Sequence, residues 1–268
     1  MGESWRMTVW GVRGSNPTPE ADFLGYGGNT SCFSVDCGGT LAVFDAGSGL
    51  TGLGEYMARP GGPRRADIFL SHLHLDHVQG LVSFRPFFFP SKEVHLYGRP
   101  GLRESLERLL SPPWWPVGLA NFSAEVQVHE MCPGGAVSLP GGERAEAMEG
   151  RHPDGCFYYR LEGGGKRVVY ALDCEPDGEM ARQLADFARG ADLLVWDANF
   201  VEEDLKPGWG HSTWRQGLDI ARGAGIKRVL MAHYAGSYDD RFLRGQEALA
   251  REASGSVYFA REGLVMEL

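Results

Sequence analysis

Three histidines and one aspartate crowd into the stretch Ser71-His72-Leu73-His74-Leu75-Asp76-His77. It follows an apolar run, 66–71, that is typical of a buried strand. Because the first two histidines alternate with leucine, an extended backbone turns both imidazoles to the same side. Imidazole and carboxylate are ligands that zinc and similar metals prefer. The stretch therefore predicts a metal site at a strand end, with enough ligands for two ions.

Further candidate ligands occupy similar places downstream. His152, His211 and His233 each fall at or just beyond a predicted strand end or loop. Asp173 ends the apolar run that begins at Val168. An aspartate in that position is also common as a turn residue or a helix cap, so taken alone it leaves both interpretations open.

Apolar runs and their glycine and proline breakers predict two halves in which strands give way to alternating strands and helices. Strands are predicted at 8–12, 32–36, 40–44, 66–71, 94–97, 126–130, 156–162, 166–173, 192–197 and 228–232, within a strand-rich middle at 125–173. Helices are predicted at 50–57, after residue 77, and at 102–110, 179–189, 213–224 and 240–253. No linker separates the halves, so we expect one domain over residues 1–268.

Composition narrows the class of protein. Hydrophobic residues make up 43% and charged residues 23% of the 268 residues, values that exclude a disordered or fibrous chain. The 38 glycines and 15 prolines disfavour an all-α fold. A net charge of −9 makes a long nucleic acid an unfavourable partner.

Cysteine usage and the N-terminus indicate the compartment. The five cysteines form an odd set without a CxxC pair, which argues against a disulfide framework or a thiolate zinc site. Residues 1–10 lack the apolar core of a signal peptide, and no apolar run is long enough to span a membrane. We therefore expect a cytoplasmic protein that does not enter a membrane.

The histidine stretch 71–77 resembles the HxHxDH signature of the metallo-β-lactamase superfamily. Upstream, Phe44-Asp45-Ala46-Gly47 resembles the D-x-G turn of that family. His152, Asp173 and His233 follow in the order of its later ligand motifs, so the resemblance covers nearly the whole chain. It implies a four-layer αββα sandwich, an α/β fold in which two sheets face each other, helices lie outside, and metals bind at one edge between the sheets.

The resemblance also implies a ligand set. One ion would be held by His72, His74 and His152, a second by Asp76, His77 and His233, and both by the bridging Asp173. Zinc is the expected metal, with manganese or iron as alternatives, because His/Asp sites accept each. Two such ions can share a hydroxide and generate it near neutral pH, which indicates a hydrolase and gives Asp76 a catalytic as well as a ligand role. Asp45 is expected to bond backbone near the site without touching metal.

Two more motifs indicate the branch of the superfamily. The stretches 11–17 (GVRGSNP) and 27–32 (GGNTSC) resemble the start of its phosphodiesterase-like branch, which includes the tRNA 3′-end processing ribonucleases. The stretch 208–213 (GWGHST) resembles that branch's extra histidine motif, which implies that His211 helps the leaving group depart. A phosphodiester needs its leaving alkoxide protonated, so this role is chemically apt. The alternative is a loop imidazole that only bonds its neighbours. Ser212 or Thr213 is expected to cap the following helix.

The N-terminal motifs also contain candidate phosphate ligands. Arg13, Asn29, Thr30 and Ser31 can offer guanidinium, backbone and side-chain donors to phosphate oxygens. The alternative is structural: glycine-rich turns exist for backbone reasons, and Arg13 can pair with a carboxylate.

One segment of this chain differs from the tRNA-processing enzymes, and that difference indicates the substrate class. The tRNA-processing enzymes carry a long Gly/Pro-rich arm between the bridging aspartate and the extra histidine, whereas residues 174–210 predict an ordinary helix and strand here. With the acidic net charge, this favours a small phosphodiester such as a cyclic nucleotide over tRNA. The alternatives are hydrolysis of a lactone, thioester or β-lactam, an RNA-processing nuclease, an oxygen-reducing diiron protein, and a metal or nucleotide binder without activity. The resemblance to the family also implies a homodimer as the candidate assembly.

Overall fold

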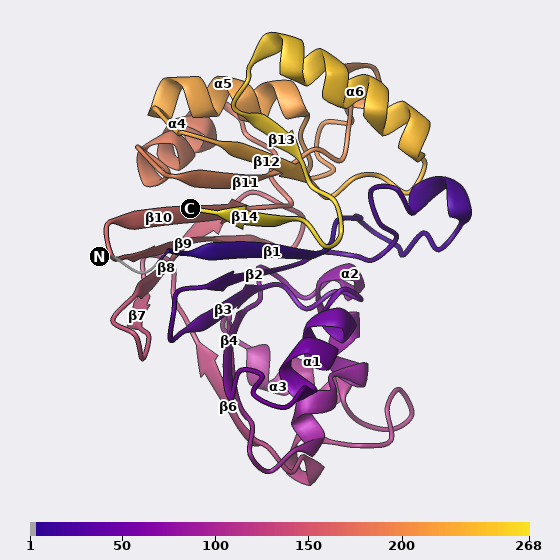
Figure 1. The fold of residues 1–268 in the computed structure, drawn as a ribbon, viewed down its shortest axis with the longest axis vertical. Coiled ribbons are helices and arrows are strands. Elements are labelled where there is room, and N and C mark those ends of the chain that lie inside the picture. Colours follow the sequence, from indigo (N-terminus) through magenta and orange to yellow (C-terminus); the bar gives the residue numbers. More distant parts are fainter. Residues whose placement is uncertain (1–3) are drawn as a thin grey trace.

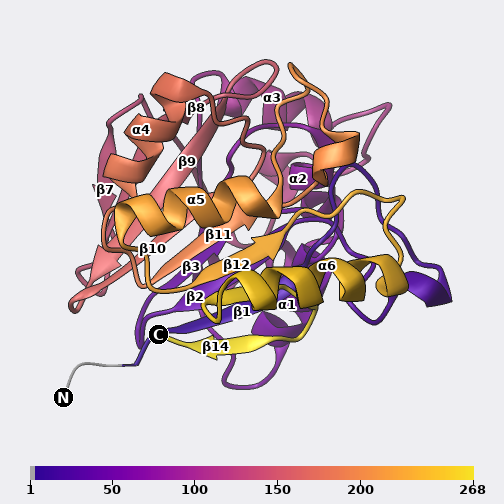
Figure 2. The ribbon, with the colours of Figure 1, turned by 90° about the horizontal axis from the view of Figure 1, so that it is seen from above.

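Two mixed β-sheets of seven strands each face one another in the computed structural model, which describes residues 4–268. Helices cover the outer side of each sheet, so the molecule has four layers (Figure 1). The view from above, in Figure 2, shows α5 and α6 lying over the strands of the second sheet. The predicted αββα sandwich is therefore confirmed.

The first sheet has the strand order β14-β1-β2-β3-β4-β5-β6. Its strands are β1 (Arg6–Gly11), β2 (Cys32–Asp36), β3 (Leu41–Phe44), β4 (Arg65–Phe69), β5 (Glu93–Gly98), β6 (Glu125–Glu130) and β14 (Val265–Glu267). Pairing is antiparallel from β14 to β3 and parallel from β3 to β6.

The second sheet has the order β13-β12-β11-β10-β9-β8-β7. Its strands are β7 (Ala136–Ser138), β8 (Arg144–Gly150), β9 (Cys156–Gly163), β10 (Lys166–Ala171), β11 (Leu193–Asp197), β12 (Val229–Ala232) and β13 (Val257–Phe259). Here β13 to β10 are parallel and β10 to β7 antiparallel, so the two sheets share one pattern.

The helices divide between the two sheets. On the first sheet lie α1 (Leu50–Ala58), α2 (Leu75–Val78) and α3 (Leu102–Leu109), and on the second lie α4 (Gly178–Phe187), α5 (Trp214–Ala224) and α6 (Asp240–Ala253) (Figure 1). Short 3₁₀ turns occur at Ala21–Phe23, Gln79–Ser83, Arg85–Phe88, Leu119–Asn121 and Glu202–Asp204. Among residues 4–268, no helix has the length and apolar character needed to cross a bilayer.

Helix α5 begins with the cap that the sequence predicts. The Thr213 hydroxyl accepts a hydrogen bond from the Gln216 N–H, and the Gln216 side chain accepts one from the Thr213 N–H. This capping box satisfies donors that the helix start would otherwise leave free. It also fixes the end of the loop that carries His211.

An aromatic layer joins the two sheets next to the loops of the site. Phe44 of β3 stacks on Tyr170 of β10 with ring centres 5.2 Å apart, and Phe69 of β4 packs on Tyr159 of β9 at 5.3 Å. All four rings are buried. The Tyr159 hydroxyl donates to the carbonyl of Leu70 at 2.7 Å, which holds the start of the histidine stretch against the second sheet.

Strand direction decides where the polar side chains gather. Because β10, β11 and β12 are parallel, their carboxyl ends meet at one edge of the second sheet, next to the end of β4 in the first. Asp173, Asp197 and His233 lie at or just after those three ends, and His152 follows β8. In Figure 1 this edge lies beside α2. The three-residue strands β7, β13 and β14 were not individually predicted, because three residues are too few to show a clear alternation.

Candidate metal centre

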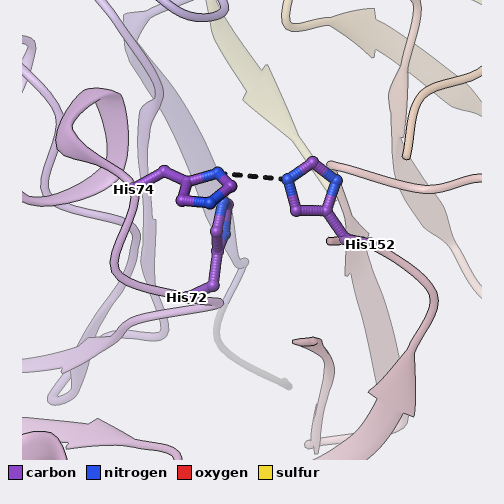
Figure 3. A group of neighbouring side chains, drawn as sticks. All are labelled: His72, His74 and His152. Carbon is purple, nitrogen blue, oxygen red and sulfur yellow. Dashed lines mark hydrogen bonds between the residues drawn. The ribbon is translucent and has the colours of Figure 1, made fainter. Parts of the chain in front are cut away.

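Seven side chains that the sequence names as ligands meet at this edge between the sheets. The ligand atoms of His72, His74 and His152 all lie within 4.8 Å of one another. Figure 3 shows these three rings turned toward each other, with His74 Nδ1 3.2 Å from His152 Nε2. A second group of the same size consists of Asp76, His77 and His233.

Asp173 lies between the two groups. Its Oδ1 is 3.3 Å from His233 Nε2 and 3.6 Å from His152 Nε2. Its Oδ2 is 3.0 Å from His77 Nε2. The carboxylate is 2% exposed. One buried side chain therefore faces both groups at once.

The far side of the ligand rings is held by hydrogen bonds. His77 Nδ1 is 2.7 Å from a carboxylate oxygen of Asp45, and His152 Nδ1 is 3.0 Å from the Gly210 carbonyl. Because these oxygens only accept, each Nδ1 carries a proton, and Nε2 is the atom that faces the centre. The hydroxyl of Ser31 lies 2.9 Å from Nδ1 of His233 in the same manner.

Several buried atoms at the centre make no hydrogen bond, and their nearest polar neighbours are other members of the cluster. Among the described residues, His72 Nε2, His77 Nε2, His233 Nε2 and Asp173 Oδ2 are buried without a hydrogen bond. An unsatisfied buried polar atom costs roughly 1–3 kcal/mol, so four at one place would be a heavy burden. A bound cation would take up their lone pairs. These residues therefore fit a metal, and the His/Asp cluster is a metal site.

The charges in the cluster also favour a cation. Burial alone would raise the pKa of Asp173, but His233, His77 and His72 outweigh it and hold that pKa well below its usual range. The pKa of Asp76 is likewise lowered, because His77 outweighs burial. Burial acts to lower the pKa of His77, yet Asp173, Asp76 and Asp45 raise it well above normal. Both carboxylates are therefore ionised, and protonated histidines, His77 above all, carry the positive charge that balances them. A bound cation would take the place of those protons.

Strained backbone is concentrated here. Among the described residues, those other than glycine with positive φ are Ser15, Asp45, Asp154, Asp173 and His233, at 54° to 64°. Two are candidate ligands, and the Ser15 N–H donates to Asp76 at 2.8 Å. Such conformations cost of order 1–3 kcal/mol and cluster at functional sites. Because none of the five is a glycine, the sequence carries no sign of them.

His211 stands beside the cluster. Its Nδ1 is 2.8 Å from Asp197 Oδ2, and its ring centre is 5.3 Å from that of His233. It also falls within ligand distance of His152 and Asp173. Burial acts to lower its pKa, but Asp197 outweighs burial and raises the pKa of His211 to about 9. The imidazole is therefore protonated at neutral pH.

Asp197 and Asp45 are the supports of this site. Sequence analysis did not single out Asp197, although it ends an apolar strand just as Asp173 does, and that signal was available. Asp45 accepts from the Ser71 N–H at 2.7 Å, which confirms the predicted backbone bond, and also from the Tyr170 hydroxyl at 2.7 Å. Its contact with His77 shows that it orients a candidate ligand.

A small cavity of about 130 Å³ opens onto the centre. It is lined by Ser15, His74, Asp76, His152, Pro153, Asp173, Trp209, His211 and His233. His211 thus faces the same space as the candidate ligands, which favours a role in chemistry over a purely structural one.

Comparison with known proteins agrees with this geometry. Residues 41–234 match the model of the beta-lactamase superfamily domain. The chain belongs to the metallo-β-lactamase superfamily. Ribonuclease Z of Myxococcus xanthus is 25% identical to it, over 98% of this chain and 97% of that one. This full-length similarity confirms the branch that the N-terminal and His211 motifs predict.

Solved structures show the same fold. The metallo-β-lactamase fold protein YhfI from Bacillus subtilis superposes with a TM-score of 0.77 at 22% identity, covering 99% of this chain and 100% of that one. A diphosphatase from the PhnP family gives a TM-score of 0.74 at 20% identity, with 98% of each chain covered. The family match, the ribonuclease Z relatives and the His/Asp cluster together make the chain a metal-dependent hydrolase of the superfamily.

Of the two roles considered for Arg13, the structure favours the structural one. This side chain is fully buried, and its three nitrogens donate to the carbonyls of Gly27, Tyr238 and Phe23 at 2.7, 2.7 and 3.0 Å. Each of the three guanidinium nitrogens donates to a buried backbone carbonyl, which favours a structural role over phosphate binding. The carboxylate of Asp240 is 4.0 Å away and adds a weak ion pair. Through these bonds, Arg13 connects the N-terminal loops of the chain to the segment that follows β12.

The other candidate phosphate ligands also make structural contacts. They are Asn29, Thr30 and Ser31. The Asn29 N–H donates to Glu262 at 2.5 Å, Thr30 is buried and bonds the Ser48 N–H, and Ser31 contacts His233. None of the three lines the cavity. Their polar atoms support loops and a candidate ligand, and so are not free for substrate.

Removal and return of metal tests the centre. Zinc binds the folded state alone, so a thousandfold excess over Kd stabilises by about 4 kcal/mol, a Tm rise on the order of 10 °C. We expect the Tm of chelator-stripped protein to rise by this amount when zinc is added, with two ions bound per chain. Asp173→Asn is expected to bind less zinc and to gain less, by calorimetry and elemental analysis. His129→Asn, outside the centre, is the control. Unchanged zinc content in Asp173→Asn would contradict the assignment.

Replacement of Arg13 tests whether its role is structural. Arg13→Met leaves three buried carbonyls without donors, so the free energy of unfolding is expected to fall by about 3 kcal/mol or more in a denaturant titration. Arg6→Met, which removes an exposed ion pair with Asp36, should cost under about 1 kcal/mol. A near-normal stability of Arg13→Met together with weaker phosphate binding would restore the ligand role.

Proposed function

We propose that this protein is a dinuclear zinc phosphodiesterase that hydrolyses a small phosphodiester, with a cyclic nucleotide as the leading candidate, in a reducing cytoplasm. The observation that carries the proposal is the cationic His211 beside a His/Asp metal site. A protonated imidazole held by a buried carboxylate can act as a general acid and donate its proton to an atom on which negative charge develops. Departure of an alkoxide from phosphorus creates that charge.

The ligand assignment is part of the proposal. One ion would be held by His72, His74 and His152, the second by Asp76, His77 and His233, and Asp173 would contact both. Nitrogen and oxygen ligands suit zinc, and manganese or iron would also be accepted. When bound, two such ions supply Lewis acidity and a nucleophile at neutral pH.

The remaining steps belong to the side chains. His211 keeps its Nδ1 on Asp197, which leaves Nε2–H to donate to the leaving oxygen. Asp197 is held in turn by the backbone N–H groups of Cys174 and Asn199, at 3.1 and 2.8 Å, so the pair is rigid. Asp76 is ionised and anchored by the Ser15 N–H, and its lowered pKa makes it a weak base. It would therefore hold the second ion and accept a hydrogen bond from the attacking water. The proton of that water would pass to solvent, and His211 would supply the proton that the leaving oxygen takes up.

Several features favour a small phosphodiester over the alternatives. The names ribonuclease Z and diphosphatase both describe cleavage at phosphorus. A long RNA is disfavoured by the charge of −9 and by residues 174–210, which form α4, β11 and short loops and no extended arm. Hydrolysis of a lactone, thioester or β-lactam has less need of an acid such as His211. A second copy of the chain is the candidate protein partner.

Leaving-group dependence tests the function and the role of His211 together. The substrates are bis(p-nitrophenyl) phosphate, whose aryl leaving group departs without a proton, and 2′,3′-cyclic AMP, whose alkoxide needs one. We expect zinc- or manganese-dependent turnover of both by the reloaded protein. His211→Ala should lower kcat on the cyclic nucleotide by about 10²–10⁴-fold and on the aryl ester far less, with zinc content unchanged.

Two results would oppose this proposal. Absence of turnover of either phosphodiester while both metals bind would favour a carbonyl substrate. A loss of zinc in His211→Ala that matches the loss of activity would make His211 a ligand.

The pH profile tests the His211–Asp197 pair. Asp197 raises the pKa of His211, so the acid form persists to about pH 9 and is lost as pH rises further. Asp197→Asn removes that charge, and the alkaline limb of kcat on the cyclic nucleotide is expected to move to lower pH. An alkaline limb at the same pH in both proteins would assign it to another group.

A further inference from the structure

A tryptophan stands exposed at the mouth of the cavity. Trp209 is 57% exposed, although it lines the same space as His152 and His211. Trp114 is also exposed, at 76%, but does not line this cavity. A large aromatic ring left in water next to reacting groups is available to bind a ligand.

The loop that carries this ring is firmly held. The carboxylate of Glu175 accepts the N–H groups of Gly208 and Gly210 at 2.7 and 2.8 Å, on either side of Trp209. The Gly210 carbonyl bonds His152 Nδ1. A Cβ at Gly210 would lie 2.1 Å from that nitrogen, and φ there is 81°, so only glycine allows this approach. The indole is therefore displayed at a fixed place relative to a candidate metal ligand.

The cavity admits only part of a substrate. Its volume of about 130 Å³ is small beside the roughly 300–1,000 Å³ of pockets that enclose a whole ligand. A phosphoryl group fits inside, and the rest of the molecule extends beyond this cavity, either past Trp209 or into a neighbouring cavity of about 300 Å³ that His72, His74 and Arg99 line. The Lys206 ammonium is 4.4 Å from the Trp209 ring centre, so it covers one face of the indole and leaves the other. The rim thus offers an aromatic face and a positive charge beside the reacting phosphorus.

We propose that Trp209 is a specificity residue that stacks on the base of a nucleotide phosphodiester. This rests on the proposed function, and it names the substrate class: a phosphodiester that bears an aromatic base. Every base has a flat face that an indole can cover, so stacking selects nucleotides without selecting one base. The same base chemistry occurs in a cyclic mononucleotide and at an RNA end.

The test separates the base from the phosphodiester. Zinc-loaded wild type, Trp209→Ala, Trp209→Phe and the control Trp114→Ala are assayed on 2′,3′-cyclic AMP, on the dinucleotide ApA, and on the base-free 2′,3′-cyclic phosphate of methyl riboside. We expect Trp209→Ala to raise KM on cyclic AMP about 5- to 150-fold with little change in kcat. Its KM on the base-free ester should stay near that of wild type. Trp209→Phe should restore most of the loss, and Trp114→Ala should behave as wild type. Comparison of ApA with cyclic AMP tells which source of the base is preferred.

Direct binding keeps this proposal separate from the proposed function. Calorimetric titration with AMP and with ribose 5-phosphate needs no turnover, and we expect wild type to prefer AMP and Trp209→Ala to lose that preference. If no phosphodiester is hydrolysed, the proposed function fails while this titration still decides the stacking. Equal KM changes with and without a base, or an unchanged preference for AMP, would overturn it. A change of oligomeric state in Trp209→Ala with unchanged AMP binding would make the ring a contact between copies.

Discussion

A single buried carboxylate, Asp45, holds the sandwich and the metal site in one frame. It is fully buried and accepts hydrogen bonds from the backbone and hydroxyl of Ser71, from His77 and from the Tyr170 hydroxyl. Tyr170 belongs to the second sheet, whereas Ser71 follows β4 of the first. A buried charge is tolerated only when it is fully hydrogen-bonded, so the relative position of the sheets and the aim of a metal-facing ring are set together.

The centre is built at a local cost that the rest of the molecule offsets. Buried nitrogens without hydrogen bonds and left-handed backbone at Asp173 and His233 oppose folding. The aromatic layer of Phe44, Phe69 and their partners lies directly beneath and stabilises the sandwich.

Outside the ligands, the loop around 208–213 decides what the chain can do with a metal. Gly210 binds a candidate ligand, Trp209 is displayed at the rim, His211 faces the cavity, and Thr213 caps α5. Six consecutive residues thus join the metal site, the proposed acid and the proposed base-binding face to a helix. Relatives that share the sandwich can differ in substrate through such a loop, because the strands beneath it need not change.

The sequence by itself determined most of the strand and helix order, apart from β7, β8, β13 and β14, because apolar runs are local patterns. The resemblance of its histidine and aspartate motifs to a known family indicated the seven candidate ligands. The same local reasoning left the role of Arg13 open, since a guanidinium in a glycine-rich loop looks the same in sequence whether it contacts phosphate or three carbonyls. Tertiary structure alone decided that Arg13 is buried, that Asp197 supports His211, and that Trp209 remains exposed at the cavity. Each of these depends on which segments, distant in sequence, pack together, and no local pattern records that.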